Sequence, residues 1–175
     1  MVDEVSIGFA DGPDSEPCSA TTLFQAGSIS KQVIGRPDVA VGHHKGQAVT
    51  VHPGFAQIPG TGDLWTTTAD LVGFSQALRS GVVIVESTAA QLWSTHASLD
   101  PPSADSAEAL FVAQGYGYGT FLGRIGGQRA RFHPGDNPGY QSLLAYLPER
   151  DLDLVALGNE DDPGVQAVVP RLTRI

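Results

Sequence analysis

The chain of 175 residues carries 10 lysine and arginine residues against 19 aspartate and glutamate residues, a formal net charge of −9 at pH 7. This charge argues against partners such as nucleic acid and anionic membrane surfaces. Hydrophobic residues make up 41% of the chain and charged residues 17%, as in globular proteins, and the length fits one domain with its own core. Residues 1–175 are therefore expected to form a single domain.

The compartment is read from the cysteine content and the first residues. Cys18 is the only cysteine, so no disulfide can form within the chain. Residues 1–4 lack the basic start of a signal peptide, no apolar run follows them, and no run approaches the length of a membrane span. The sequence as written predicts a cytoplasmic protein, or a secreted or periplasmic one if a leader was trimmed.

The first half of the chain predicts short strands and helices. Strands are expected over 5–9 and 21–24, a short helix over 28–34, and mostly loop with brief strands over 38–63. A helix ending at Gly81 is then predicted, because a capping-box-like start is followed by apolar residues at helical spacing. These are Thr67 and Asp70 for the start, and Leu71, Phe74 and Leu78 for the apolar face.

The second half predicts a sheet. A helix over 86–96 with Leu92 and Trp93 buried is followed by a mobile polar loop over 99–109. Four strands and a C-terminal helix come next: strands 117–125, 128–133, 142–147 and 152–157, hairpin turns at 126–127 and 148–151, and a helix over 165–172. The predicted fold class is α+β, an antiparallel β-sheet flanked by helices.

Ser28 and Lys31 form an S-x-x-K step where a predicted strand meets a turn. In a helix this spacing puts the hydroxyl and the amine on one face. Lysine can take the serine proton only if desolvation or a nearby cation lowers its pKa. By itself the step also fits an exposed N-cap serine followed by a solvated lysine.

The segment 23–31, Leu-Phe-Gln-Ala-Gly-Ser-Ile-Ser-Lys, resembles the nucleophile segment of the serine β-lactamase and penicillin-binding superfamily. The likeness is greatest to class C β-lactamases, D-alanyl-D-alanine carboxypeptidases and family VIII esterases. Three further segments resemble family motifs in the expected order: 60–71 the "G-G-L-x-S-T-x-x-D-L" segment, 116–123 the "Y-G-L-G" strand, and 132–149 "H-x-G-x-x-x-G-F … L-P-E".

The resemblance implies a β-lactamase/transpeptidase-like α/β half and a set of site residues. Ser28 would be the nucleophile and Lys31 its base, and His133 would lie on an edge strand opposite the serine and position substrate. Gly135 would let the substrate backbone approach, and the N–H groups of Ser28 and Asp136 would bind the oxyanion. At His133 the alternative is a strand-end histidine satisfied by a carbonyl.

The family's helical subdomain, with its cleft tyrosine, has no counterpart by motif. Only the six-residue bridge 32–37 separates Lys31 from the segment that resembles the return to the α/β half. Two functions follow as alternatives: a serine hydrolase with weak activity on an ester, a β-lactam or a D-Ala peptide, or a catalytically inert scaffold or binding module. The chain does not determine which substrate is used, nor whether the subdomain is deleted naturally, by engineering or by omission of a disordered stretch.

The remaining motifs predict no cofactor and no metal. His43 and His44 are adjacent, so on an extended chain they point to opposite faces. With His52 as a third histidine, no carboxylate or cysteine lies at a spacing typical of metal ligands. Tyr116 and Tyr118 are interpreted as sheet packing, with a cleft role for one of them as the alternative.

A homodimer is expected if the subdomain is missing. Its absence would expose an apolar patch, and such patches rarely stay uncovered on a monomer. The patch comprises Ile29, Val33, Ile34, Phe55 and Ile58.

Overall fold

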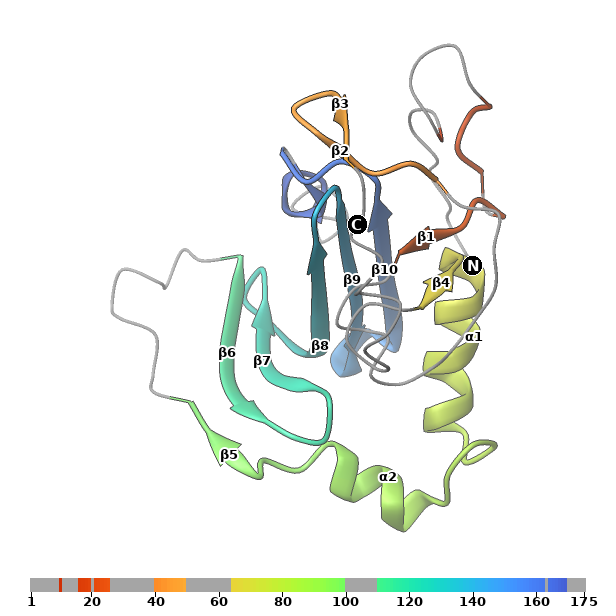
Figure 1. Cartoon of the computed structure of the whole chain (residues 1–175). Coiled ribbons are helices and arrows are strands. Elements are labelled where there is room, and N and C mark those ends of the chain that lie inside the picture. Colours follow the sequence, from red (N-terminus) through yellow and green to blue (C-terminus); the bar gives the residue numbers. More distant parts are fainter. Residues whose placement is uncertain are drawn as a thin grey trace.

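The computed structural model describes residues 10, 16–19, 21–25, 40–49, 64–99, 110–162 and 164–169. Its centre is a six-stranded antiparallel sheet in the order β10-β9-β8-β7-β6-β5 (Figure 1). Helix α1 (Thr68–Arg79) lies alongside β10, and α2 (Glu86–Leu92) lies with β5 at the far end of the sheet. The α+β fold class predicted from the sequence is confirmed.

The sheet is a meander in which each strand pairs with the next along the chain. Its strands are β5 (Ala97–Ser98), β6 (Phe111–Tyr116), β7 (Phe121–Ile125), β8 (Gln128–Asn137), β9 (Tyr140–Leu147) and β10 (Leu152–Gly158). Pro148–Arg150 form a short 3-10 turn, η4, between β9 and β10. The hairpin turns predicted at 126–127 and 148–151 are therefore confirmed.

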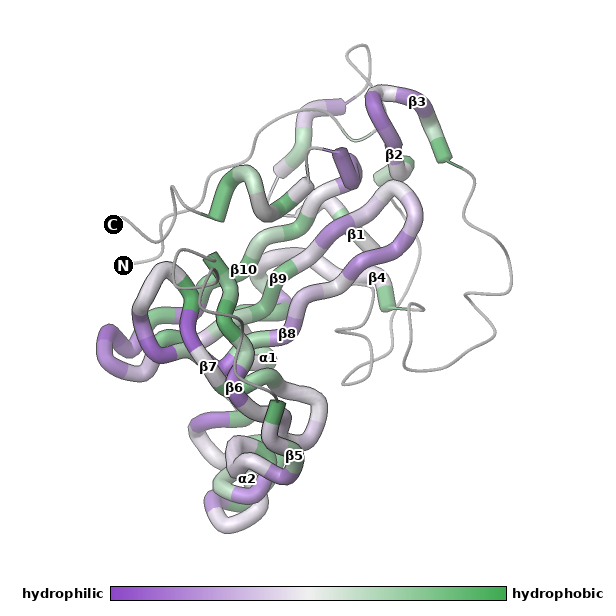
Figure 2. The backbone as a smooth tube through the Cα atoms, turned by 90° about the vertical axis from the view of Figure 1, so that its left-hand side faces the viewer, coloured by the Kyte–Doolittle hydropathy of each residue, from purple (hydrophilic) through white to green (hydrophobic). Residues whose placement is uncertain are grey.

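One face of the sheet carries the main hydrophobic core. Because side chains alternate along a strand, every second residue of β8, β9 and β10 points to this face. The core includes Ile125, Phe132, Leu143, Leu147 and Leu154, packed with Val165 and Val169 at the short 3-10 turn η5 (Val165–Ala167). Figure 2 shows apolar stretches along β9 and β10. Burying a leucine or isoleucine side chain contributes about 1.5–3 kcal/mol, so this face supplies much of the folding free energy.

The opposite face of the sheet packs against α1. The helix begins as predicted, since the Thr67 hydroxyl oxygen accepts a hydrogen bond from the Asp70 backbone N–H at 3.1 Å. Leu71 of α1, Leu64 and Leu144 form a second buried cluster, with Phe74 against it. A capping side chain of this kind contributes about 1 kcal/mol.

Two residues shape the turn that joins β8 to β9. Pro138 takes the second position, and Gly139, with a φ of +80°, takes the third, as in a type II turn. A Cβ on Gly139 would lie 2.8 Å from the carbonyl carbon of Gly42, so no side chain fits there. The glycine before Tyr140 in the "H-x-G-x-x-x-G-F"-like segment thus has a structural reason.

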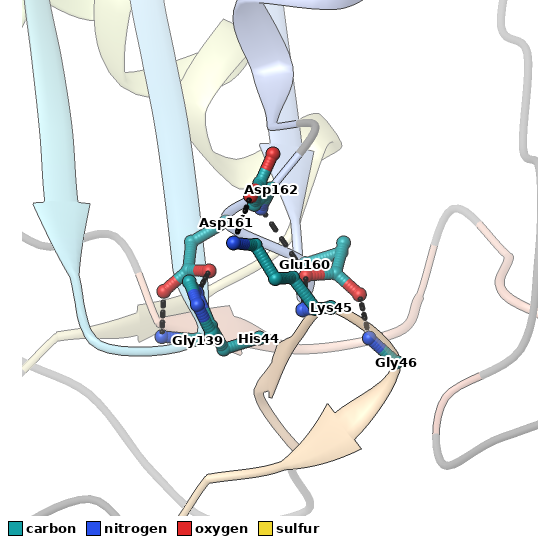
Figure 3. Close-up of polar contacts among 7 residues, drawn as sticks. All are labelled: His44, Lys45, Gly46, Gly139, Glu160, Asp161 and Asp162. Carbon is teal, nitrogen blue, oxygen red and sulfur yellow. Dashed lines mark hydrogen bonds and ion pairs between the residues drawn. The ribbon is translucent and has the colours of Figure 1, made fainter.

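A small hairpin docks at this end of the sheet. Strands β2 (His43–His44) and β3 (Gln47–Ala48) meet an acidic turn, in which the Glu160 carboxylate accepts hydrogen bonds from the backbone N–H groups of Lys45 and Gly46, each at 2.9 Å (Figure 3). Asp161 accepts from His44 Nδ1 at 2.6 Å and from the Gly139 N–H at 2.8 Å. The carboxylates therefore tie the hairpin to both β10 and the β8–β9 turn.

Three predictions for the second half of the chain need correction. The strand predicted over 117–125 is a turn at 117–120 followed by β7, and β6 before it is a strand that the sequence did not predict. The helix predicted over 86–96 ends at Leu92; Ala89 is its buried residue, and Leu92 and Trp93 are only half-buried. The helix predicted over 165–172 begins as a 3-10 turn, and residues 170–175 lie outside the described part.

The predicted strand 21–24 appears as β1 (Phe24–Gln25), which pairs with β4 (Trp65–Thr66). The strand predicted over 5–9, the helix over 28–34, the bridge 32–37 and the loop residues 100–109 all lie outside the described residues. Among the helices in the described ranges, none is long and apolar enough to cross a membrane.

Candidate functional site

The segment His133-Pro134-Gly135, called the H-P-G segment below, lies in the part of β8 that extends beyond its pairing with β7. The ladder between β7 and β8 begins at Phe121↔Phe132 and runs away from the segment, whereas β8 pairs with β9 through Asn137↔Tyr140. Beyond Phe132, β8 therefore has a strand neighbour on one side only among the described strands. The edge position expected for His133 is local: β8 is an inner strand of the sheet as a whole.

His133 and Gly135 share the sheet face that packs against α1, and Asp136 lies on the other face. Both follow from the pairing of His133 with Leu144 and of Asp136 with Gln141. His133 and Gly135 are buried, whereas Asp136 is exposed. The Asp136 carboxylate is therefore solvated. Only the backbone of Asp136, and not its side chain, continues the strand edge that carries His133 and Gly135.

The hydrogen bonds of His133 define its tautomer. Nδ1 lies 2.6 Å from the Pro134 carbonyl oxygen, which can only accept, so Nδ1 carries a proton. Nε2 lies 3.2 Å from the Tyr116 hydroxyl. In the neutral imidazole Nε2 is then the acceptor, and Tyr116 donates to it. Burial raises the pKa of the Tyr116 phenol, so this donor keeps its proton at neutral pH.

Aromatic rings surround the imidazole. Phe121 lies with its ring centroid 5.4 Å from that of His133, and Tyr116 packs edge-on against Phe121 at 4.7 Å. Tyr116 thus packs in the sheet as predicted and also contacts the candidate site residue.

A pocket opens beside His133 between α1 and the sheet. It is lined by side chains of α1 and the sheet, by Trp93 just after α2 and by Thr120 just before β7, and its polar residues include Ser75, Arg79, Thr120, Arg131 and His133. Thr120 is buried. The sequence analysis named neither Thr120 nor Arg131. Strand alternation could have found Arg131, because it lies two residues before His133 and so shares its face.

The wall of the pocket is held by a buried ion pair. Arg79 Nη1 and Nη2 donate to Asp153 Oδ1 and Oδ2 at 2.6 and 2.7 Å, and the Ser75 hydroxyl donates to Oδ1 at 2.6 Å. Burial alone would lower the pKa of Arg79, but the hydrogen bonds and charge of Asp153 outweigh it and raise the pKa. Arg79 also lies 3.8 Å above the Tyr146 ring. The network fastens α1 to β10.

The structure brings together only part of the predicted site. His133, Gly135 and Asp136 lie on one strand beside the pocket, while Ser28 and Lys31 lie outside the described residues. Strand β1 ends three residues before Ser28 and contacts β9 and β10. In the described ranges no group of three or more histidine, cysteine, aspartate or glutamate side chains is arranged to hold a metal ion.

Comparison with known protein families identifies the family of the chain. The family described as Beta-lactamase matches residues 34–174, a range that includes the whole H-P-G segment and begins after Lys31. The chain belongs to the beta-lactamase family. No match was found among the curated proteins.

Solved structures share the fold. A D-amino acid amidase from Ochrobactrum anthropi SV3 is similar with a TM-score of 0.56 and 22% identity, over 70% of this chain and 35% of that protein. An octameric penicillin-binding protein homologue from Pyrococcus abyssi gives 0.54 and 21%, over 71% and 27%. A D-stereospecific amidohydrolase from Streptomyces sp. gives 0.53 and 19%, over 81% and 40%. The chain thus spans 27 to 40% of the length of these proteins.

Proposed function

We propose that the chain is a serine hydrolase in which Ser28 is acylated. The Ser28 hydroxyl oxygen attacks the carbonyl carbon of the substrate while Lys31 takes the hydroxyl proton. The N–H groups of Ser28 and Asp136 bind the oxyanion of the tetrahedral intermediate. Collapse of that intermediate breaks the bond to the leaving group, which takes a proton, and water then hydrolyses the acyl-enzyme.

The geometry of His133 is the observation that carries this proposal. His133, held by Pro134 and Tyr116, lies beside a pocket at a point where β8 has a strand neighbour on one side only among the described strands. An extended substrate can add along a strand that is paired on one side only. In the proposed arrangement His133 positions the substrate.

The chain connectivity agrees with this placement of Ser28. Ser28 follows Gln25 of β1 by three residues, and three residues of extended chain span at most about 11 Å. Because β1 contacts β9, a strand paired to β8, this short reach supports a serine near the H-P-G segment.

The proposed substrates are carbonyl compounds with a reactive acyl group. We keep an ester, a β-lactam and a D-Ala peptide as candidates, since all three react through the same serine and lysine. D-amino acid amides join them because two of the structurally similar proteins are a D-amino acid amidase and a D-stereospecific amidohydrolase.

The alternative is an inert scaffold or binding module. Two observations favour it: both ring nitrogens of His133 already have partners within the chain, and the family match begins after Lys31. An NMR titration of Lys31 separates the two functions. A pKa below about 8 supports a base, whereas the ordinary value near 10.4 supports a scaffold with a solvated lysine.

Hydrolysis of a p-nitrophenyl ester tests the proposal with two matched pairs of variants. Ser28→Ala should abolish the activity and Ser30→Ala, two residues away, should retain it. Likewise Lys31→Ala should lose the activity and Lys45→Ala, at the tip of the β2–β3 hairpin, should keep it. Equal rates for Ser28→Ala and the unmodified protein would overturn the proposal.

A further inference from the structure

Arg131 is a half-buried arginine without a carboxylate partner among the described residues. Its guanidinium lies 4.3 Å from the centre of the Trp93 ring and 5.9 Å from that of Tyr146. Two other arginines differ in this respect: Arg79 is paired with Asp153, and Arg129 donates to Glu149 at 2.7 Å. Aromatic faces attract a cation, but they do not satisfy its N–H donors.

The charges around the pocket leave it positive. Partial burial lowers the pKa of the Arg131 guanidinium, and the charges of Arg129 and Arg79 lower it further, yet it stays protonated at pH 7. Asp153 compensates Arg79 and not Arg131. Asp151, another acid among the described residues, does not line this pocket, and its carboxylate accepts a hydrogen bond from the Tyr146 hydroxyl at 2.9 Å. A positive pocket on a chain of net charge −9 is suited to an anion.

The side chains that line the pocket indicate which class of anion it can bind. Among the described residues the pocket presents one uncompensated cation, Arg131, so a monoanion fits it better than a phosphate dianion. Trp93, Tyr146, Leu78 and Leu144 add flat aromatic and aliphatic surface. A guanidinium binds a planar carboxylate through two parallel hydrogen bonds.

We propose that Arg131 binds the carboxylate of a small organic molecule whose apolar body lies against the apolar side chains of the pocket wall. Arg131 precedes His133 by two residues on the same face of β8, so their Cα atoms are about 7 Å apart. If that molecule is the substrate, which rests on the proposed function, its carboxylate lies on the face of β8 that also carries His133. The pocket then selects acids over neutral analogues.

Binding of phenylacetate and of its neutral isostere phenylacetamide tests the inference without any turnover. The probe is followed by NMR at the indole N–H of Trp93, which Trp65→Phe identifies, since the chain has two tryptophans. We expect saturable binding of phenylacetate and at least tenfold weaker binding of phenylacetamide, because a hydrogen bond to a charged group contributes about 1.5–3 kcal/mol.

Substitutions on β8 test whether Arg131 is the residue that binds the carboxylate. Arg131→Gln should weaken phenylacetate binding at least tenfold, and Arg129→Gln, an exposed arginine two residues away, should leave it unchanged. Equal affinity for acid and amide in the unmodified protein would overturn the inference, and this comparison needs no variant that must fold. Loss of affinity in both variants alike would also overturn it, by indicating general charge attraction.

The outcome is independent of catalysis. If the protein binds phenylacetate through Arg131 but does not hydrolyse esters, the carboxylate site is supported and the proposed hydrolase function is overturned. If the protein hydrolyses neutral esters through Ser28 but binds phenylacetate and phenylacetamide equally, only the carboxylate site is overturned.

Discussion

Replacing Asp153 by alanine should destabilise the protein far more than removal of a surface carboxylate. The Asp153 side chain is only 8% exposed and that of Arg79 only 18%. Asp153 accepts three hydrogen bonds, two from Arg79 and one from Ser75. Asp153→Ala therefore leaves a nearly buried guanidinium without its counter-charge.

The magnitude follows from that burial. Removing one partner of a buried ion pair costs about 3–5 kcal/mol, because the remaining charge stays desolvated. Glu149→Ala is the matched control: its pair with Arg129 has side chains 53% and 64% exposed, and exposed pairs contribute about 0–1 kcal/mol. For a chain of this length each kcal/mol lowers the melting temperature by about 2–4 °C.

Urea unfolding followed by circular dichroism measures both variants. We expect a loss of about 3–5 kcal/mol for Asp153→Ala and under about 1 kcal/mol for Glu149→Ala. The double variant Arg79→Met/Asp153→Leu should recover much of the loss, since an apolar pair of similar volume leaves no buried charge. Equal losses for Asp153→Ala and Glu149→Ala would refute this account of how α1 is held to the sheet.

Three further predictions concern the hairpin, the site and association. Backbone N–H donors outweigh partial burial and lower the pKa of Glu160. The contribution of Glu160 to stability is therefore present above the unfolded value of 4.5 and is lost as the pH falls through the lower folded value. The protection factors of the Lys45 and Gly46 amides, which are corrected for the intrinsic exchange rate at each pH, should drop there, and unchanged protection factors would contradict this. Tyr116→Phe removes the donor to His133 Nε2 and should lower kcat/KM for an ester about tenfold, with Tyr118→Phe as the control; equal rates would exclude the contact from the site. Sedimentation over a concentration series should show a homodimer, and a strict monomer at high micromolar concentration would indicate that the predicted apolar patch is covered within the chain.

The hairpins and the capped helix could be predicted from the sequence because local chemistry defines them. Gly126 and Gly127 both have positive φ in the β7–β8 turn, and Thr67 caps α1 as its spacing with Asp70 indicates. The division of 117–125 into a turn and β7 could not be read in this way. It depends on tertiary contacts, such as the close approach of Gly117 to the carbonyl of Leu92, that leave no periodic pattern.

The site residues stay predictions. The structure places His133 beside a pocket, and its contact with Tyr116, which lies 17 residues earlier in the sequence, leaves no local signal. The ion pair of Arg79 with Asp153 joins residues 74 apart and leaves no local signal. The roles of Ser28 and Lys31 stay predictions based on the S-x-x-K resemblance.

Mass spectrometry of the protein after incubation with a fluorescent penicillin tests the acyl-transfer proposal most directly. We predict a mass increase equal to one bound β-lactam, which peptide mapping locates at Ser28 and which Ser28→Ala abolishes while Ser30→Ala retains it. An adduct at another residue, or an equal adduct in Ser28→Ala, would contradict the account.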